Sequence, residues 1–299
     1  MKHWIKAFRL RTLPLALSCI FMGNFIAVLH SYHGEIRTSV AVLAILTTIF
    51  LQILSNLAND LGDSQHGADS DQRTGPSRTV QSGEISSAQM KRAVYVFLIL
   101  SLISGCYLLY MAFGTDLGHY LSFLGLGLLS IAGAVYYTMG KNPYGYMGLG
   151  DISVYLFFGL LGVGGTYFLH LKTLSVDVLL LAHSCGMFSV GVLNLNNVRD
   201  IDSDEKAGKH SIPVRIGKRK AILYHWFLLL SGFGSAVVYA FLNFNHLTQW
   251  AFLLTFPLFL LNGIKLQKAE NSGQIDPLLK QLALSTLIFV LVFGTFALL

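Results

Sequence analysis

The sequence predicts an all-α integral membrane protein with nine transmembrane helices. Charged residues make up 12% of the chain, whereas they make up roughly 25% of ordinary soluble domains. Hydrophobic residues make up 54%, and the mean hydropathy is +0.59. The distribution of Lys and Arg between alternate loops is a third, independent indication, because basic residues collect in cytoplasmic loops.

The nine predicted spans follow from segment length and from their boundaries. A helix needs about 20 predominantly apolar residues to cross the hydrocarbon core of a bilayer. Each candidate is bounded by polar residues or by Gly and Pro. The first is expected to remain a span rather than a cleaved signal peptide, because no small-residue cleavage site stands out. The spans are 13–30, 38–58, 93–113, 118–137, 149–169, 175–195, 222–242, 248–264 and 281–299.

The basic residues test this topology without reference to hydropathy. If the N-terminus is cytoplasmic, 19 of the 21 Lys and Arg residues fall in cytoplasmic segments, and only Arg37 and Lys172 do not. This asymmetry is the one that the positive-inside rule expects. The formal net charge of +6 therefore reflects the concentration of Lys and Arg in the predicted cytoplasmic loops. We expect no nucleic-acid partner, because no basic patch interleaved with aromatic residues occurs.

The chain is expected to form one domain over residues 1–299, because no linker or low-complexity tract divides it. The three cysteines, Cys19, Cys106 and Cys185, lie within spans and lack the spacing of metal ligands. We interpret them as small hydrophobic core residues.

Two short acidic stretches, 59–71 and 196–204, follow the second and sixth spans and repeat one spacing. Asn59 and Asp63 are four residues apart, and Asn196, Asp200 and Asp204 are four apart twice. Side chains at this spacing project from one face of a helix. Carboxylate and amide oxygens are hard donors that suit Mg²⁺. Two such helix ends could hold Mg²⁺ ions between them, with diphosphate oxygens completing the coordination.

Cationic residues close to these stretches fit a bound diphosphate. Arginine can contact phosphate oxygens through two parallel hydrogen bonds. The alternative interpretation is a pair of solvated acidic loops, but the helical spacing beside membrane spans favours a metal site. The cations concerned are Arg73, Arg78, Lys141, Lys206 and Lys209.

Four segments together resemble the signature segments of UbiA-type membrane prenyltransferases. They are NDLGDSQHGADSDQRTGPSR, YTMGK, NPYGYMGLGDISVYLFFG and NNVRDIDSDEKAGKHSIPVRIG. The resemblance runs from Arg11 to about Gly217 and is strongest to the branch that acts on 1,4-dihydroxy-2-naphthoate. It implies nine helices around a central cavity, which is capped on the cytoplasmic side by the two acidic loops.

The resemblance also assigns residues. It implies that the first acidic stretch binds Mg²⁺ through a family pattern of one Asn and two Asp at intervals of four residues. Asn59 and Asp63 match the first two positions, and Gly67 stands at the third. Asp69 is taken as the substitute for the missing Asp, with Asp71 less favoured. The second motif matches without a gap, and the family's YxxxK element matches Tyr137 and Lys141. The implied metal ligands are Asn59, Asp60, Asp63, Asp69, Asn196, Asp200 and Asp204, and the implied catalytic residues are Asp63, Asp200, Asp204, Lys141 and Tyr137.

The implied reaction transfers a polyprenyl group from polyprenyl diphosphate to 1,4-dihydroxy-2-naphthoate. Mg²⁺ and cationic side chains would stabilise the departing diphosphate, and the apolar helices would keep the allylic cation from water. Loss of CO₂ would then give demethylmenaquinone, in menaquinone biosynthesis at the bacterial inner (plasma) membrane, with the isoprenoid tail among membrane lipid.

Substrate contacts by other residues stay open at this point. Arg73 or Arg78 could bind either the acceptor carboxylate or phosphate, and Lys209 is a further candidate for substrate binding. Asp151 could orient Tyr146 or a substrate hydroxyl, or could cap the fifth span. His183 is expected to form an interhelical hydrogen bond rather than act as a base.

Two other functions remain as alternatives. The acceptor could be 4-hydroxybenzoate or another phenol, and the segment NPYGYMGLGD is the reason to prefer naphthoate. A secondary transporter could also place acids around an ion site. Transporter sites, however, lie near the bilayer midplane, whereas these acids lie at the ends of spans.

Overall fold

The computed structural model describes residues 2–32, 36–65 and 78–299. Within these ranges every regular element is helical. The elements are α1 (Lys2–Phe8), η1 (Leu10–Thr12), α2 (Leu13–His30), α3 (Thr38–Gln65), α4 (Ser87–Phe113), α5 (Leu117–Tyr136), η2 (Tyr144–Met147), α6 (Gly150–Val154), η3 (Tyr155–Gly165), α7 (Thr166–Leu171), α8 (Val178–Arg199), α9 (Ile201–Lys206), α10 (Ile212–Asn243), η4 (Leu247–Thr255), α11 (Phe256–Lys268) and α12 (Ser272–Ala297).

The predicted spans are confirmed in number and order. In the described part of the chain, nine helical segments are long and apolar enough to cross a membrane. Several extend beyond the predicted spans, because a helix continues through polar residues that lower the local hydropathy. Helix α3 ends at Gln65 rather than at residue 58, and α10 begins at Ile212. Both acidic stretches therefore begin on a helix.

The fifth span has an unusual backbone. It runs through α6, η3 and α7 without a break, and η3 is a π-helix of 11 residues. Gly159 in this segment packs closely on α8. A Cβ added to Gly159 would lie 2.6 Å from the carbonyl oxygen of Ala182. π-Helical turns are rare and occur frequently at functional sites.

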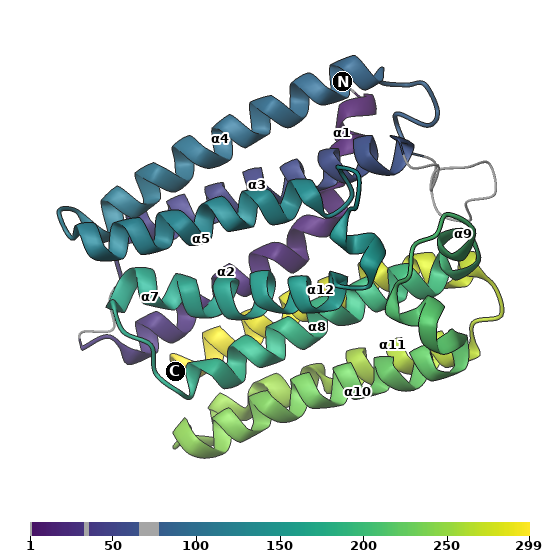
Figure 1. Ribbon diagram of the computed structural model, residues 1–299. Coiled ribbons are helices and arrows are strands. Elements are labelled where there is room, and N and C mark those ends of the chain that lie inside the picture. Colours follow the sequence, from purple (N-terminus) through teal and green to yellow (C-terminus); the bar gives the residue numbers. More distant parts are fainter. Residues whose placement is uncertain (1, 33–35, 66–77) are drawn as a thin grey trace.

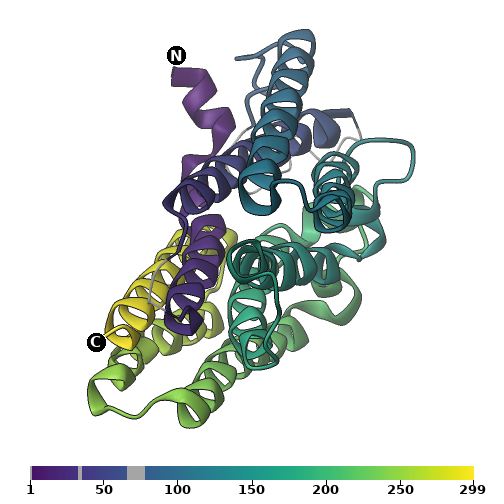
Figure 2. The same ribbon diagram turned by 90° about the vertical axis from the view of Figure 1, so that its left-hand side faces the viewer.

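The long helices run side by side in two neighbouring groups (Figure 1). Helices α3, α4 and α5 pack on one another, and α2, η3, α8, α10 and α12 form the second group. Figure 2 shows the two groups nearly end-on. Helix α2 contacts both α3 and α12, so it joins the groups.

The largest hydrophobic core lies in the second group and is rich in phenylalanine. Phe188, Phe233, Phe259 and Phe289 are each at most 4% exposed. The rings of Phe188 and Phe259 have centroids 4.4 Å apart. Aromatic pairs at such distances add to the stability from burial, so this core fixes α8 against α10, α11 and α12.

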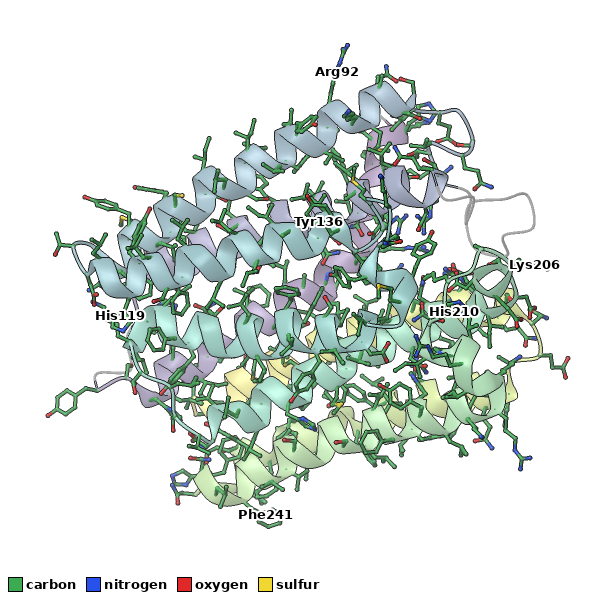
Figure 3. All side chains as sticks on the ribbon, viewed as in Figure 1. Arg92, His119, Tyr136, Lys206, His210 and Phe241 are labelled. Carbon is green, nitrogen blue, oxygen red and sulfur yellow. The ribbon has the colours of Figure 1, made fainter. Side chains whose placement is uncertain are left out.

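The described part of the first acidic stretch, 59–65, and the second stretch lie at the same end of the bundle. The C-terminal ends of α3 and α8, the short helix α9 and the start of α12 meet there (Figure 1). Figure 3 labels Lys206 and His210 at this end and His119 at the opposite end. The helix directions thus bring together two segments that are more than a hundred residues apart in the sequence.

Candidate active site

Two sets of Asn and Asp side chains converge at this end. Asn59 and Asp63 belong to the last two turns of α3, Asn196 to the last turn of α8, Asp200 directly follows α8, and Asp204 lies on α9. Asp63, Asp200 and Asp204 are all buried. Burial raises the pKa of the Asp204 carboxyl, Lys209 opposes this shift, and the negative charges of Asp200 and Asp63 add to it. The two sets are therefore close enough to interact electrostatically.

Each buried carboxylate of these sets is paired with a cation. Asp63 forms an ion pair with Arg78, which also donates from Nη1 to the backbone oxygen of Asn59 at 2.7 Å. The Lys209 Nζ lies 2.9 Å from Asp204 Oδ2. Buried charges are tolerated only when they are compensated in this way. We call Asn59 and Asp63 the first donor set, and Asn196, Asp200 and Asp204 the second.

Asp200 is paired with Arg199, its neighbour in the sequence. Arg199 Nε donates to Asp200 Oδ1 at 2.8 Å, and Nη2 donates to Asp200 Oδ2 at 2.6 Å. Nη2 also donates to Asn196 Oδ1 at 2.8 Å. One guanidinium group therefore holds the oxygens of two predicted metal ligands.

The segment that contains η2 bridges the two donor sets. The hydroxyl of Tyr146 donates to Asp63 Oδ1 at 2.7 Å, and the backbone N–H of His210 donates to the Tyr146 carbonyl at 2.9 Å. Gly148 has a positive φ of 81°, and a Cβ there would lie 2.6 Å from the His210 carbonyl oxygen. Only glycine allows this close approach. Burial, followed by the negative charge of Asp63, raises the pKa of Tyr146, so the tyrosine remains a hydrogen-bond donor.

Asn59 is held against the segment after α5. Thr138 Oγ1 lies 3.1 Å from Asn59 Oδ1 and 3.2 Å from the Ala58 carbonyl oxygen. Gly62 permits this contact, because a Cβ there would lie 2.6 Å from the Thr138 carbonyl oxygen. The first donor set is thus fixed by packing as well as by charge.

Asp60 faces a different direction from its neighbour Asn59. Its Oδ2 accepts hydrogen bonds from the backbone N–H of Thr79 at 3.2 Å and from Thr79 Oγ1 at 2.6 Å. Successive residues on a helix point about 100° apart. In the structure Asp60 therefore anchors the loop at Thr79 through Oδ2, and its predicted role as a metal ligand stays a prediction.

The donor sets open onto a large apolar cavity of about 420 Å³, which we call the main cavity. Asn59, Asp63, Arg78, Asn196 and Lys209 line its polar end. The α3 face that lines the cavity runs from residue 44 to residue 63, a length of about 28 Å along the helix. Most of the remaining lining is apolar and comes from α2, α3, α4, α5, η3 and α8. The cavity thus extends across most of the hydrocarbon thickness of a bilayer.

A second cavity, of about 380 Å³, adjoins the polar end. It lies between η1 and the two donor sets and shares Arg9, Arg78 and Asn196 with the main cavity. Arg9 has a positive φ of 48°, which is uncommon for a residue other than glycine and is often found at functional sites. The cationic residues that line this cavity are Lys6, Arg9, Arg11, Arg78 and Arg199.

The YxxxK residues are separated in the structure. Tyr137 lines the main cavity, and its ring lies edge-on to Tyr144 with the centroids 5.4 Å apart. Lys141 is exposed and is not among the described residues that line either cavity. Its role near a diphosphate stays a prediction. Asp69, Asp71 and Arg73 lie outside the described residues.

Asp151 contacts a residue that the sequence did not suggest. It accepts a hydrogen bond from Tyr224 at 3.0 Å, whereas Tyr146 donates to Asp63. Leu149 precedes the first residue of α6, so Asp151 does not cap this helix. Asp151 thus neither orients Tyr146 nor caps α6, because its carboxylate accepts from a partner on α10. Its suggested contact with a substrate hydroxyl stays a prediction.

His183 forms the interhelical hydrogen bonds that were predicted. Its Nδ1 lies 3.0 Å from the Tyr155 hydroxyl, and its Nε2 lies 2.9 Å from Ser231 Oγ. The cysteines are free, and Cys19 and Cys185 are buried. Cys19 and Cys106 also line the main cavity, which the sequence did not indicate.

The donor sets suit Mg²⁺ that is bound together with a substrate diphosphate. Among the described residues, no three His, Cys, Asp or Glu side chains come close enough to form a complete protein site. Mg²⁺ is usually held by one or two carboxylates, waters and substrate phosphates rather than by an all-protein cage. The oxygen donors of both sets and the cations beside them fit this mode of binding.

The pattern of the UbiA prenyltransferase family matches residues 16–287. The chain belongs to the UbiA prenyltransferase family. It is similar to the 1,4-dihydroxy-2-naphthoate octaprenyltransferase of Haemophilus influenzae, with 40% identity over 98% of this chain and 95% of the relative. The Escherichia coli enzyme of the same name is 40% identical over 96% of this chain and 94% of its own length.

A solved structure shares the fold. The structure of a UbiA homologue from Archaeoglobus fulgidus bound to GPP and Mg²⁺ superimposes with a TM-score of 0.65 and covers 99% of both chains. The sequences are 17% identical, so this likeness shows the fold alone.

Sequence reasoning missed several residues of the site. Tyr146, Arg199 and Arg9 were not assigned roles, although each contacts a donor set or lines the cavity beside one. For Arg199 a signal was available, because an arginine between two predicted ligands, Asn196 and Asp200, can reach both. The contact between Tyr146 and Asp63 spans 83 residues and gives no local signal.

Proposed function

We propose that the protein transfers a polyprenyl group from polyprenyl diphosphate to 1,4-dihydroxy-2-naphthoate, with loss of CO₂, in a Mg²⁺-dependent reaction that yields demethylmenaquinol. This is the quinol form of demethylmenaquinone, and its oxidation to the quinone is a separate step. The observation that carries the proposal is the pair of facing Asn and Asp sets at the polar end of a long apolar cavity. Relatives that are 40% identical over nearly the full length bear the name of this activity. The whole chain, residues 1–299, would act as one catalytic domain.

The diphosphate would bind at the polar end of the main cavity. Asn59 and Asp63 from the first donor set and Asn196, Asp200 and Asp204 from the second would hold the metal. Bound Mg²⁺ supplies Lewis-acid stabilisation of the charge that develops on the leaving diphosphate. Arg78 and Lys209 line the same end and would donate hydrogen bonds to phosphate oxygens, Arg78 through two parallel bonds.

The isoprenoid tail would lie in the apolar part of the main cavity. Its walls are largely aliphatic and aromatic, so they exclude water from the allylic cation that forms when the C–O bond breaks. The rings of Tyr137, Phe157 and Phe158 line this cavity. Aromatic ring faces attract a cation within about 6 Å, and these three are candidates for that contact together with Phe123 and Tyr144, which also line the cavity.

The second cavity is the proposed route for the water-soluble acceptor. Its cationic lining attracts an anion, and its shared residues Arg9 and Arg78 lead to the polar end of the main cavity. We assign the acceptor carboxylate to Arg9, because Arg78 is taken up by Asp63 and the diphosphate. An Arg–carboxylate pair with two parallel hydrogen bonds would fix the position of the aromatic ring as well as neutralise its charge.

The reaction balances without an added oxidant or base. The ring carbon that bears the carboxylate supplies the electron pair for the new C–C bond to the allylic carbon. The C–O bond of the prenyl diphosphate breaks, and its electrons leave with the diphosphate. The bond to the carboxylate then breaks, and its electrons return to the ring as CO₂ departs.

The protein is a multi-pass membrane protein, and we propose the bacterial inner membrane as its location, with the N-terminus in the cytoplasm. The support is that 19 of 21 Lys and Arg residues then fall on the cytoplasmic side. Both donor sets would face the cytoplasm, where a water-soluble aromatic acid is available.

The test is a turnover assay with the purified full-length chain in detergent. Labelled polyprenyl diphosphate is offered with 1,4-dihydroxy-2-naphthoate or with 4-hydroxybenzoate, and prenylated lipid, CO₂ and diphosphate are measured. We expect all three products in equal amounts from naphthoate, and none after removal of Mg²⁺ with a chelator.

Two outcomes would overturn the proposal in different ways. Turnover of 4-hydroxybenzoate but not of naphthoate would leave a prenyltransferase with the wrong acceptor. If no diphosphate were released with any acceptor, the protein would not be a prenyltransferase. That result is the one expected of a secondary transporter.

A further inference from the structure

The first turns of α12 hold Arg199 from two sides. Arg199 Nη1 donates to Asp276 Oδ1 at 2.5 Å, and the hydroxyl of Ser272 donates to the Arg199 carbonyl at 2.9 Å. Arg11 Nη1 lies 3.4 Å from the other oxygen of Asp276. We call Arg199, Asp276 and Ser272 the α12 clamp. Asp276 and Ser272 lie outside every sequence motif considered above.

The clamp fixes the orientation of two oxygen donors. The Arg199 side chain is 1% exposed, and it donates to both oxygens of Asp200 and to the amide oxygen of Asn196. A planar guanidinium has five N–H groups in a fixed geometry, so holding one edge of it sets the direction of the others. The contact between Asp276 and Nη1 therefore controls how Asn196 and Asp200 present their oxygens.

These hydrogen bonds leave the donors able to bind a cation. Each carboxylate oxygen has two lone pairs, and an amide oxygen also has two. Arg199 uses one on each oxygen that it contacts. In metal sites, outer residues that hydrogen-bond to the ligands in this way orient them, and their mutation typically lowers metal affinity about 10- to 100-fold.

We propose that Asp276, acting through Arg199, is a positioning residue for the second donor set. The inference rests on the proposed function, because it takes Asn196 and Asp200 to be metal ligands. Asp276 makes no contact with metal or substrate in this role. Helix α12, at the end of the chain, thereby determines the geometry of a site whose donors come from α3, α8 and α9.

A metal-binding measurement separates this role from a purely structural one. The full-length chain in detergent is titrated with Mn²⁺ in the presence of inorganic diphosphate, and bound Mn²⁺ is measured by electron paramagnetic resonance. Asp276→Asn is expected to weaken Mn²⁺ binding about tenfold. Glu270→Gln is the matched control, because Glu270 is an exposed acid between α11 and α12 and loses the same charge. Its Mn²⁺ affinity is expected to equal that of the wild type.

Two further measurements keep the inference testable if Asp276→Asn is unstable. Arg199→Lys keeps the charge but loses the paired hydrogen bonds, and it is expected to weaken Mn²⁺ binding by a similar factor. Adding Asp276→Asn to Arg199→Lys is then expected to change the affinity less than twofold, since both act through one group. The Tm of each metal-free variant serves as the check on folding.

The outcomes distinguish this inference from the proposed function. If wild type binds Mn²⁺ and Asp276→Asn binds it equally well, the inference is refuted and the proposed function stands. A lower metal-free Tm with unchanged Mn²⁺ affinity also refutes it, because the pair would then be only structural. If the wild type binds no Mn²⁺ in the presence of diphosphate, both this inference and the proposed function are refuted.

Discussion

Replacing Tyr146 with phenylalanine removes one hydroxyl from the candidate active site and leaves the aromatic ring in place. This hydroxyl donates to Asp63 Oδ1 at 2.7 Å from a buried position. The backbone contact between Tyr146 and His210 does not involve the side chain and is expected to remain. The substitution therefore changes the orientation of the Asp63 carboxylate with little effect on the bridge between the donor sets.

The size of the effect follows from the kind of hydrogen bond. A hydrogen bond to a charged group contributes about 1.5–3 kcal/mol, and each 1.36 kcal/mol corresponds to a factor of about ten in rate. Arg78 continues to pair with Asp63 after the substitution, which places the loss at the lower end of this range. We expect kcat/KM for polyprenyl diphosphate to fall about tenfold.

The assay measures initial rates as a function of Mg²⁺ and polyprenyl diphosphate concentration. Tyr146→Phe is expected to raise the Mg²⁺ concentration needed for half-maximal rate, because a less well oriented carboxylate binds the metal more weakly. Tyr136→Phe is the matched control, since Tyr136 is 59% exposed and is not among the described residues that line either cavity. Its rates are expected to equal those of the wild type.

The reasoning fails if Tyr146→Phe keeps its kcat/KM within twofold of the wild-type value. The hydroxyl would then not orient Asp63 for catalysis. The Tm of the variant is measured beside the rates, because the buried Asp63 Oδ1 loses its donor and some loss of stability is expected. Rates are compared at a temperature where both proteins are folded.

Other predictions concern the donors, the YxxxK lysine and pH. Asp63→Ala and Asp200→Ala are each expected to abolish turnover while the protein stays folded in detergent; activity in both variants would refute the site. Lys141→Met is expected to weaken diphosphate binding in a competition assay, and unchanged affinity would count against the YxxxK assignment. Hydrogen bonds from Lys6 and then His3 lower the pKa of Glu84 to about 2. The stability contributed by the ionised Glu84 should therefore be complete above about pH 4.5 and should be lost as the pH falls toward 2. Tm measurements over that range should show a smaller pH dependence for Glu84→Gln.

The arrangement of spans could be predicted because two independent properties of the sequence carry it. Hydropathy located the apolar segments, and the loop distribution of Lys and Arg agreed with their number. The ends of the helices were less accessible, because a hydropathy pattern records where apolar residues stop and not where the backbone changes. Helix α3 continues to Gln65, so the first donor set lies on a helix, as the spacing of Asn59 and Asp63 had indicated.

The partners of the donors could not be predicted. Asp63 meets Tyr146 across 83 residues, and Arg199 meets Asp276 across 77. Spacing along a helix reveals neighbours within about one turn, but it carries no information on which distant side chain comes to rest against them. Asp60 illustrates the same difficulty. Its residue type and position suggested a metal ligand, but the sequence did not show that its carboxylate would accept hydrogen bonds from Thr79.

Charge balance explains why the described donors form no complete metal site on their own. The candidate active site pairs each buried carboxylate of the donor sets with one cationic side chain. A divalent cation alone would add positive charge that nothing offsets in a poorly solvated region. A diphosphate alone would add excess negative charge. Either uncompensated charge is costly to bury. Mg²⁺ and diphosphate added together largely cancel each other. The donor sets therefore favour the metal–diphosphate pair over either component, so the site is expected to assemble only when a prenyl diphosphate is present.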